Sequence, residues 1–153
     1  MRKALFLDRD GVINVDAGYV HVPQDFVFID GIFDFCQLAA ANGYLIIVVT
    51  NQSGIGRGLF TEEEYQRTNN YMIEEFRRRG VEISDVFHCP DLESEDRKPN
   101  PGMFFKAKRK WDLDMDRSIS VGDRERDVQA GASAGVGKNL LFTGDFNDLK
   151  EEL

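Results

Sequence analysis

The chain has 153 residues, 42% of them hydrophobic and 30% charged, which is enough apolar material for the core of one domain spanning residues 1–153. Its formal net charge of -8 disfavours nucleic acid and anionic membranes as partners, because both attract positively charged surfaces. The two cysteines cannot form a disulfide framework and no segment has the length and apolarity of a membrane span, so we expect the reducing cytoplasm as the compartment. The sequence does not fix the oligomeric state, and a monomer is the default expectation.

Short apolar segments alternate with amphipathic ones along the chain. The apolar segments are predicted strands, at residues 4–7, 44–49, 86–87, 119–121 and 139–142. Helices are predicted at 32–42, from the capping box at Thr61 to about Arg79, after Asn100 as N-cap with Pro101 in the first turn, at 127–134, and as a short tail at 147–153. Because parallel strands need crossover connections, this alternation predicts an α/β fold, a three-layer Rossmann-like parallel sheet covered by helices.

Polar residues follow four of the predicted strands. They are Asp8 and Asp10, the segment 50–54, the pair Arg97 and Lys98 beyond a polar loop, and Asp123 with Arg124. Each group alone is typical of a turn, a helix cap or a solvated surface. Together they favour a functional site, because ligands bind at the carboxyl ends of parallel strands and clustered carboxylates require a cation among them.

The chemistry that suits this set is phosphoryl transfer to a carboxylate. Clustered aspartate oxygens are suitable ligands for Mg²⁺. Two carboxylates placed two residues apart can divide the work, one attacking phosphorus and the other moving a proton. A lysine and a threonine hydroxyl can orient and neutralise the phosphoryl oxygens.

Four segments, FLDRDGVIN, VVTNQSG, RKPNPGM and VGDRERD, resemble in this order the motifs of the haloacid dehalogenase (HAD) superfamily of phosphatases. Within it, NVDAGYV, FIDG and NQSGIGRG resemble the heptose-bisphosphate and histidinol-phosphate phosphatase subfamily. The resemblance implies a HAD-like fold and a Mg²⁺-dependent phosphatase that works through an aspartyl-phosphate. The expected substrate is D-glycero-D-manno-heptose 1,7-bisphosphate, and histidinol phosphate is the alternative.

The resemblance also implies roles for individual residues. Asp8 would be the nucleophile and Asp10 the general acid and base, while Thr50 and Lys98 would bind the transferring phosphoryl group. Asp8, Asp123 and the main-chain carbonyl of Asp10 would hold Mg²⁺. The positions that match substrate contacts of the subfamily are Asp16, Ala17, Gly18, Tyr19, Asn51, Gln52, Ser53, Arg97 and Arg124.

The segments between the strands are too short for a separate cap domain, so we expect an open site. Specificity would then rest on the loops 16–19, 54–60 and 91–96. If the backbone is extended at Arg97 and Lys98, the two side chains point to opposite sides, so only one of them can face Asp8. The resemblance assigns that position to Lys98.

One segment departs from the subfamily, which often has a structural zinc loop with three cysteines and one histidine. Here the loop reads HCPDLESEDRKP and offers only His88 and Cys89, so structural zinc is not expected. A rival of another class, a phospho-accepting signalling receiver, also uses aspartates, a threonine and a lysine. In a receiver the phosphorylated aspartate follows the third strand, whereas here the acids follow the first and fourth.

Overall fold

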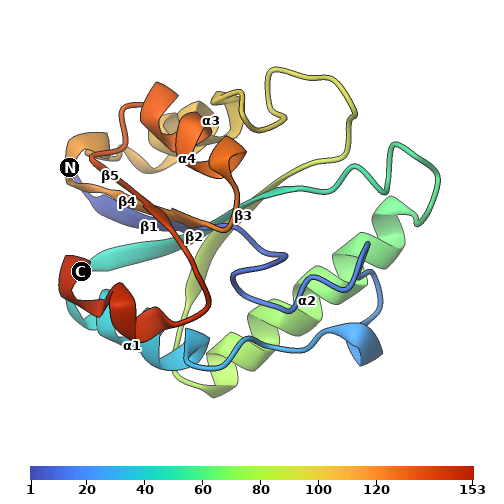
Figure 1. Cartoon of the computed structure of the whole chain (residues 1–153), viewed down its shortest axis with the longest axis horizontal. Coiled ribbons are helices and arrows are strands. Elements are labelled where there is room, and N and C mark those ends of the chain that lie inside the picture. Colours follow the sequence, from blue (N-terminus) through green and yellow to red (C-terminus); the bar gives the residue numbers. More distant parts are fainter.

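Five parallel strands form one sheet at the centre of the computed structural model, which describes all of residues 1–153 (Figure 1). The strands lie in the order β3-β2-β1-β4-β5. Their bounds are Lys3–Leu7 for β1, Tyr44–Asn51 for β2, Ile83–Cys89 for β3, Ile119–Gly122 for β4 and Lys138–Leu141 for β5. Because β1 is the middle strand, the residues that follow it emerge at the centre of the carboxyl edge of the sheet.

Two pairs of helices cover the two faces of the sheet, α1 and α2 on one side and α3 and α4 on the other (Figure 1). Their bounds are Ile32–Ala41 for α1, Glu62–Arg78 for α2, Gly102–Trp111 for α3 and Glu125–Ser133 for α4. Short 3₁₀ turns lie at Pro23–Asp25, Met115–Arg117, Phe146–Asp148 and Lys150–Glu152. The predicted α/β fold, a three-layer parallel sheet without a separate cap domain, is therefore confirmed.

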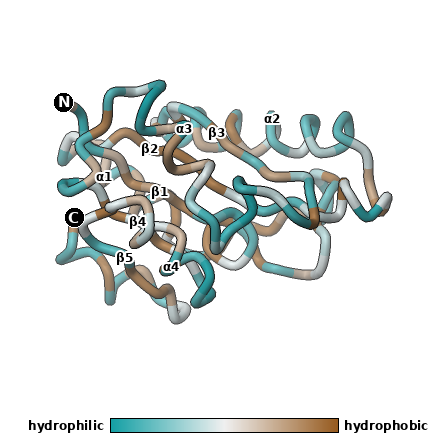
Figure 2. The backbone as a smooth tube through the Cα atoms, turned by 90° about the horizontal axis from the view of Figure 1, so that it is seen from above, coloured by the Kyte–Doolittle hydropathy of each residue, from teal (hydrophilic) through white to brown (hydrophobic).

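The alternating side chains of the strands build two cores. Leu5 and Leu7 face α1 and α2, whereas Ala4 and Phe6 face α3 and α4. Since the sheet is buried on both faces, β1 and β2 are apolar along most of their length, and Figure 2 shows this apolar colour at the centre of the molecule. No helix has both the length and the apolar character that a membrane crossing requires.

Several element boundaries differ from the predictions, each for a local reason. The edge strand β3 begins at Ile83, because pairing with β2 overrides its polar residues. The strand β2 continues through Thr50 and Asn51, so these residues lie within the strand and not after it. The helix α4 begins at Glu125, two residues before the predicted start. The predicted tail consists of two 3₁₀ turns.

The prediction of Asn100 as N-cap of α3 is wrong. Pro101 occupies the N-cap position, and the Asn100 side chain donates instead to the carbonyl of Ser94 at 2.8 Å. This contact closes the loop before α3. The capping box of α2 is confirmed, since Thr61 and Glu64 exchange both of its hydrogen bonds.

Candidate active site

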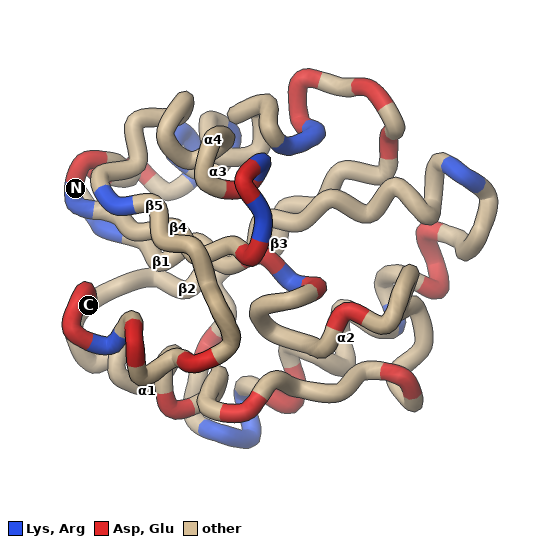
Figure 3. The backbone as a smooth tube through the Cα atoms, viewed as in Figure 1, with Lys and Arg blue, Asp and Glu red and all other residues tan.

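A polar cavity of about 330 Å³ opens at the carboxyl ends of the strands. Its lining consists of Asp8, Asp10, Asp16, Gly18, Tyr19, Asn51, Gln52, Ser53, Gly54, Arg57, Arg97, Lys98, Arg124 and Arg126. Figure 3 shows acidic and basic stretches of the chain meeting near these strand ends. Five of the lining side chains are cationic and three are carboxylates, although the chain as a whole carries a charge of -8. Such a local excess of positive charge suits an anionic ligand.

Lys98 lies at the base of the cavity, buried between two carboxylates. Its Nζ atom lies 3.0 Å from Asp8 Oδ1 and 2.7 Å from Asp127 Oδ1. It also donates to the carbonyl of Val49 at 2.8 Å. Burial alone would lower the pKa of Lys98, but the charges of Asp8 and Asp127 raise it, so the ammonium group stays protonated.

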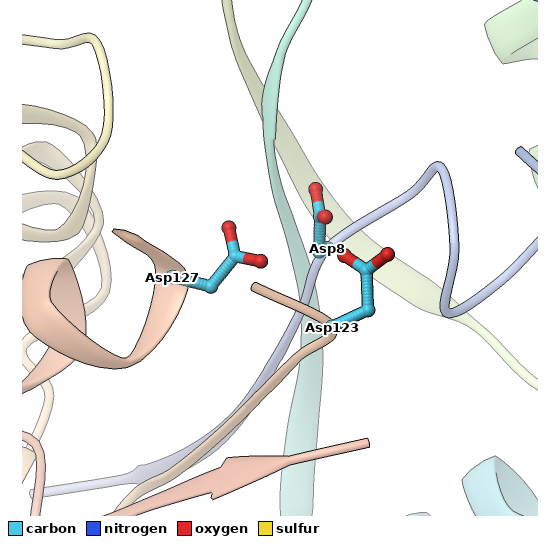
Figure 4. A group of neighbouring side chains, drawn as sticks. All are labelled: Asp8, Asp123 and Asp127. Atoms are coloured by element: carbon cyan, nitrogen blue, oxygen red, sulfur yellow. The ribbon is translucent and has the colours of Figure 1, made fainter. Parts of the chain in front are cut away.

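Three carboxylates, those of Asp8, Asp123 and Asp127, lie close together (Figure 4), and two of them, Asp8 and Asp127, pair with Lys98. Each offers one oxygen, and these oxygens all lie within 4.8 Å of one another. Burial raises the pKa of Asp8 to about 7; Lys98 opposes the shift, while Asp127 and Asp10 add to it. Burial and the charge of Asp127 likewise raise the pKa of Asp123. The cluster thus holds more negative charge than Lys98 neutralises.

The donor set fits a hard divalent cation. Asp123 Oδ1 is buried without a hydrogen-bond partner, and Asp8 presents a second carboxylate beside it. Oxygen donors of this kind are those that Mg²⁺ prefers. Asp127 is already engaged, because Oδ1 pairs with Lys98 and Oδ2 accepts the backbone N–H of Arg124 at 3.1 Å.

Asp10 is held in one orientation by three side chains. Its Oδ1 accepts hydrogen bonds from Arg9 Nη2 at 3.0 Å and Asn14 Nδ2 at 2.9 Å. Its Oδ2 accepts a hydrogen bond from Gln52 Nε2 at 2.9 Å. The Arg9 side chain is buried and also donates to the carbonyl of Val20 at 2.7 Å. This network directs a partly exposed carboxyl group into the cavity.

Gly11 is required where the chain leaves β1. Its φ of 93° lies in the left-handed region, and a Cβ atom there would collide with the carboxylate of Asp123. Because no side chain intervenes, Asp123 can lie against the loop that carries Asp8 and Asp10.

Most of the site residues predicted from the sequence line this one cavity, but not all of them do. Asp16, Gly18, Tyr19, Ser53 and Arg124 line it. Ala17 is absent from the lining, so its predicted substrate contact receives no support from the geometry.

Two predicted residues are almost fully buried: Gln52 lines the cavity, whereas Thr50 is absent from its lining. Thr50 is 1% exposed, and its hydroxyl accepts a hydrogen bond from Gln52 at 3.0 Å. Gln52 is 4% exposed and uses its amide on Asp10 and Thr50. The geometry of Gln52 therefore indicates that it orients Asp10 and Thr50, and does not chiefly contact a substrate.

The extended backbone expected at Arg97 and Lys98 is not present, although Lys98 does contact Asp8, at 3.0 Å. The backbone there is a turn, in which Asn100 N donates to Arg97 O at 2.8 Å, and is not extended. Both side chains consequently line the same cavity, with Lys98 at its base.

Several residues of the site escaped the sequence reasoning: Arg9, Asn14, Arg57, Arg126 and Asp127. Asp127 had a usable signal, because it follows Asp123 by four residues at the start of a predicted helix. Arg9 and Asn14 contact Asp10 within the same loop, but the side-chain geometry that joins them is not visible in the sequence. Arg57 and Arg126 reach the cavity only through the tertiary fold.

The side chains of the loop before Lys98 have partners within the protein. His88 Nε2 lies 2.7 Å from Glu62 Oε1, and its ring stacks on Tyr65. Cys89 is buried at the end of β3, and Asp96 pairs with Lys106. The residues of this loop do not fit a tetrahedral zinc site, and the lack of structural zinc stays a prediction.

Comparison with known proteins gives consistent results. A family profile described as HAD-hydrolase-like matches residues 96–152. A Campylobacter jejuni protein named D-glycero-alpha-D-manno-heptose-1,7-bisphosphate 7-phosphatase is 47% identical over 99% of this chain and 94% of its own length. A Vibrio cholerae protein named for the beta anomer is 44% identical over 92% of this chain and 81% of its own.

A solved structure shares the fold along the whole chain. It is the D,D-heptose 1,7-bisphosphate phosphatase of B. bronchiseptica complexed with magnesium and phosphate, with a TM-score of 0.86 and 31% identity. The match covers 99% of this chain and 87% of that one.

Proposed function

Since this chain belongs to the haloacid dehalogenase superfamily and is a phosphoric monoester hydrolase of that family, we propose that it removes the 7-phosphate of D-glycero-D-manno-heptose 1,7-bisphosphate through a phosphorylated Asp8. The observation that carries the proposal is the position of Lys98. Its buried ammonium group contacts Asp8 at the base of a cavity whose wall is rich in guanidinium groups.

In the first half-reaction, a carboxylate oxygen of Asp8 attacks phosphorus, and the bond from phosphorus to the sugar oxygen breaks. Asp10 gives its proton to the departing oxygen, which leaves as the sugar hydroxyl. Lys98 neutralises charge on the phosphoryl oxygens while they move toward Asp8. The contacts from Arg9, Asn14 and Gln52 keep the Asp10 carboxyl directed at the reacting atoms.

In the second half-reaction, Asp10 is a carboxylate and takes a proton from water. The water oxygen attacks phosphorus, the bond to Asp8 breaks, and inorganic phosphate leaves with Asp8 restored. One group thus acts first as acid and then as base, which requires the fixed orientation of Asp10.

We assign Mg²⁺ to the carboxylates of Asp8 and Asp123 and to the main-chain carbonyl of Asp10. The buried, unpartnered Asp123 Oδ1 and the raised pKa values of Asp8 and Asp123 support this assignment. When bound, Mg²⁺ would neutralise the carboxylates and the phosphate oxygens, so that the two anions can approach.

The charge of the cavity favours a substrate with a second anionic group. Arg57, Arg97 and Arg126 line it, and none forms an ion pair with a carboxylate of the protein. Arg124 pairs with Asp16 at 3.4 Å. A bisphosphate can use this unneutralised charge, whereas histidinol phosphate carries a cationic amine and would use it less well.

Phosphate release from a panel of metabolites tests the substrate. The panel holds the alpha and beta anomers of heptose 1,7-bisphosphate and histidinol phosphate, each with Mg²⁺. We expect the highest kcat/KM with one heptose bisphosphate, the release of one phosphate, and a 1-phosphate product. A higher kcat/KM with histidinol phosphate would refute the substrate and favour the alternative.

The receiver alternative makes a different prediction and is not supported by relatives named as phosphatases. A receiver would not turn over a chromogenic phosphate ester. Activity in the cytoplasm, expected from two free thiols, stays a prediction.

A further inference from the structure

Asn51, the last residue of β2, holds the backbone of Lys98 with both ends of its side-chain amide. Lys98 N donates to Asn51 Oδ1 at 2.9 Å, and Asn51 Nδ2 donates to Lys98 O at 3.1 Å. Because the backbone N–H must donate and the carbonyl must accept, only one orientation of the amide satisfies both contacts. The two residues are 47 positions apart in sequence, so the pairing is tertiary.

The same strand also holds the other end of Lys98. Val49, two residues before Asn51, accepts a hydrogen bond from Lys98 Nζ at 2.8 Å. The loop that carries Lys98 contains no helix or strand, and its backbone contacts include turns such as Arg97 N to Ser94 O. The tip of β2 therefore fixes both the backbone and the ammonium group of Lys98 relative to Asp8.

We propose that Asn51 is a positioning residue for phosphoryl transfer, acting through Lys98, and not chiefly a contact to the substrate. The proposal rests on the proposed function, in which Lys98 neutralises the transferring phosphoryl group. Although Asn51 lines the cavity, one hydrogen of its amide and one lone pair of its oxygen are committed to Lys98. Misplacing a catalytic group by about 1 Å can cost about 10²-fold in rate.

The test is a double-mutant cycle between Asn51→Ala and Lys98→Ala, measured by steady-state kinetics. Two substrates are used, an aryl phosphate and heptose 1,7-bisphosphate, with saturating Mg²⁺. Asn51→Ala should lower kcat about 10²-fold on both substrates with little change in KM. In the Lys98→Ala background it should cause no further loss, because the group that it positions is gone. Asn51→Ser, whose single hydroxyl cannot span both backbone groups, should behave like Asn51→Ala and gives a second variant if the first folds poorly.

Asn139→Ala is the matched control. The amide of Asn139 also joins two segments, since it donates to the carbonyl of Val136 at 2.9 Å and accepts from the Ser120 hydroxyl at 2.7 Å. It does not line the cavity. This control should lower Tm and leave kcat at the wild-type value, which separates positioning from general stability.

The outcomes distinguish this inference from the proposed function. The positioning role would be overturned if Asn51→Ala only raised KM for the bisphosphate. It would also be overturned if Asn51→Ala lowered kcat as much in the Lys98→Ala background as in the wild type. If Lys98→Ala impairs catalysis but neither Asn51 variant does, the inference alone fails. If Lys98→Ala leaves kcat unchanged, the role of Lys98 in the proposed function fails as well.

Discussion

At the scale of single residues, Lys98 combines structural and chemical roles. Its ammonium group is buried between Asp8 and Asp127, and the neighbouring carboxylates keep it charged. A compact charge in this position can neutralise a phosphoryl oxygen without the cost of reorganising water. Four arginines line the same cavity and are less buried than Lys98. In the proposed function, they would bind a second anionic group of the substrate.

The division of roles between the buried Lys98 and the arginines of the cavity wall predicts different kinetic effects for their variants. Lys98→Ala should lower kcat and kcat/KM together, by about 10²–10³-fold, because an interaction of the transition state is lost. Arg97→Ala and Arg124→Ala should mainly raise KM for the bisphosphate and change little on an aryl phosphate. Steady-state kinetics of the three variants on both substrates checks this. The division is wrong if Lys98→Ala changes KM alone or if the arginine variants impair both substrates equally.

Gly11 gives a second prediction at this scale. Gly11→Ala should displace the Asp123 carboxylate, because the new methyl group occupies the same space. The variant should bind Mg²⁺ more weakly, and titration calorimetry of the free protein with Mg²⁺ measures this directly. Gly58→Ala is a suitable control, since Gly58 also has a positive φ, at 75°, but nothing lies within 4 Å of the added atom. Equal Mg²⁺ affinity in the Gly11 variant and the control would contradict the proposed metal site.

At the scale of elements, the start of α2 shows how a local sequence signal fixes a boundary. The Thr61 hydroxyl accepts the backbone N–H of Glu64 at 3.0 Å, and Glu64 accepts the backbone N–H of Thr61 at 3.0 Å. These bonds satisfy two helix-terminal donors that would otherwise require water. The backbone N–H of Thr61 also lowers the pKa of Glu64.

We expect Thr61→Ala to reduce the free energy of unfolding by about 1 kcal/mol. For a chain of this size the change corresponds to a Tm lower by about 2–4 °C. Because the pKa of Glu64 is lower in the folded state, its contribution is present above the ordinary value of 4.5 and is lost as the pH falls through the folded value. Thr61→Ala keeps the backbone N–H that lowers this pKa, so the pH dependence is tested with Glu64→Ala. The Tm difference between wild type and Glu64→Ala should shrink in acid, and a constant difference would contradict the pairing.

The elements also show which features of the fold the sequence predicts correctly and which it does not. The apolar runs of β1 and β2 and the cap of α2 are local signals, and the structure confirms them. The predicted strand at residues 86–87 lies within β3, but the full length of β3 depends on its pairing with β2. The predictions for the N-cap of α3 and for the backbone at Arg97 are wrong, because side-chain contacts within the loop, such as Asn100 to Ser94, decide the local backbone there.

The candidate active site shows the same limit of prediction from sequence. Asp8 and Asp123 directly follow β1 and β4, and Asp10 is two residues beyond Asp8, so the topology alone brings these carboxylates together. Lys98 lies farther along the loop after β3, and its family motif predicts its place in the site. The partners that orient them, such as Arg9 for Asp10 and Asn51 for Lys98, depend on side-chain geometry that no residue pattern encodes.

At the scale of the whole molecule, the clustered carboxylates couple stability to pH and metal. The pKa of Asp8 rises from 3.8 to about 7 on folding, so the folded state holds the proton more tightly. The contribution of Asp8 to metal-free stability therefore falls as the pH rises between these values.

Added Mg²⁺ should raise Tm more at about pH 8 than at about pH 5, because only the ionised carboxylates can act as ligands. Thermal unfolding with and without Mg²⁺ at both pH values checks this. Asp123→Asn should reduce the increase in Tm at the higher pH. An equal increase in Tm at both pH values would mean that Mg²⁺ does not bind at these carboxylates.

The central claim is that Asp8 becomes phosphorylated during turnover, and the Asp10→Asn variant offers the most direct test. This variant retains the nucleophile but cannot take a proton from water, so its hydrolytic step should slow by about 10²–10⁴-fold. An aryl phosphate is the substrate, because its leaving group departs without a proton from the enzyme. The variant is mixed with this ester and Mg²⁺, quenched in acid, and digested for mass spectrometry. The account predicts one added phosphoryl group on the peptide that contains Asp8, and none when Asp8→Asn is combined with Asp10→Asn. Turnover with no phosphoryl group on that peptide, together with wild-type activity of Asp8→Asn alone, would contradict it.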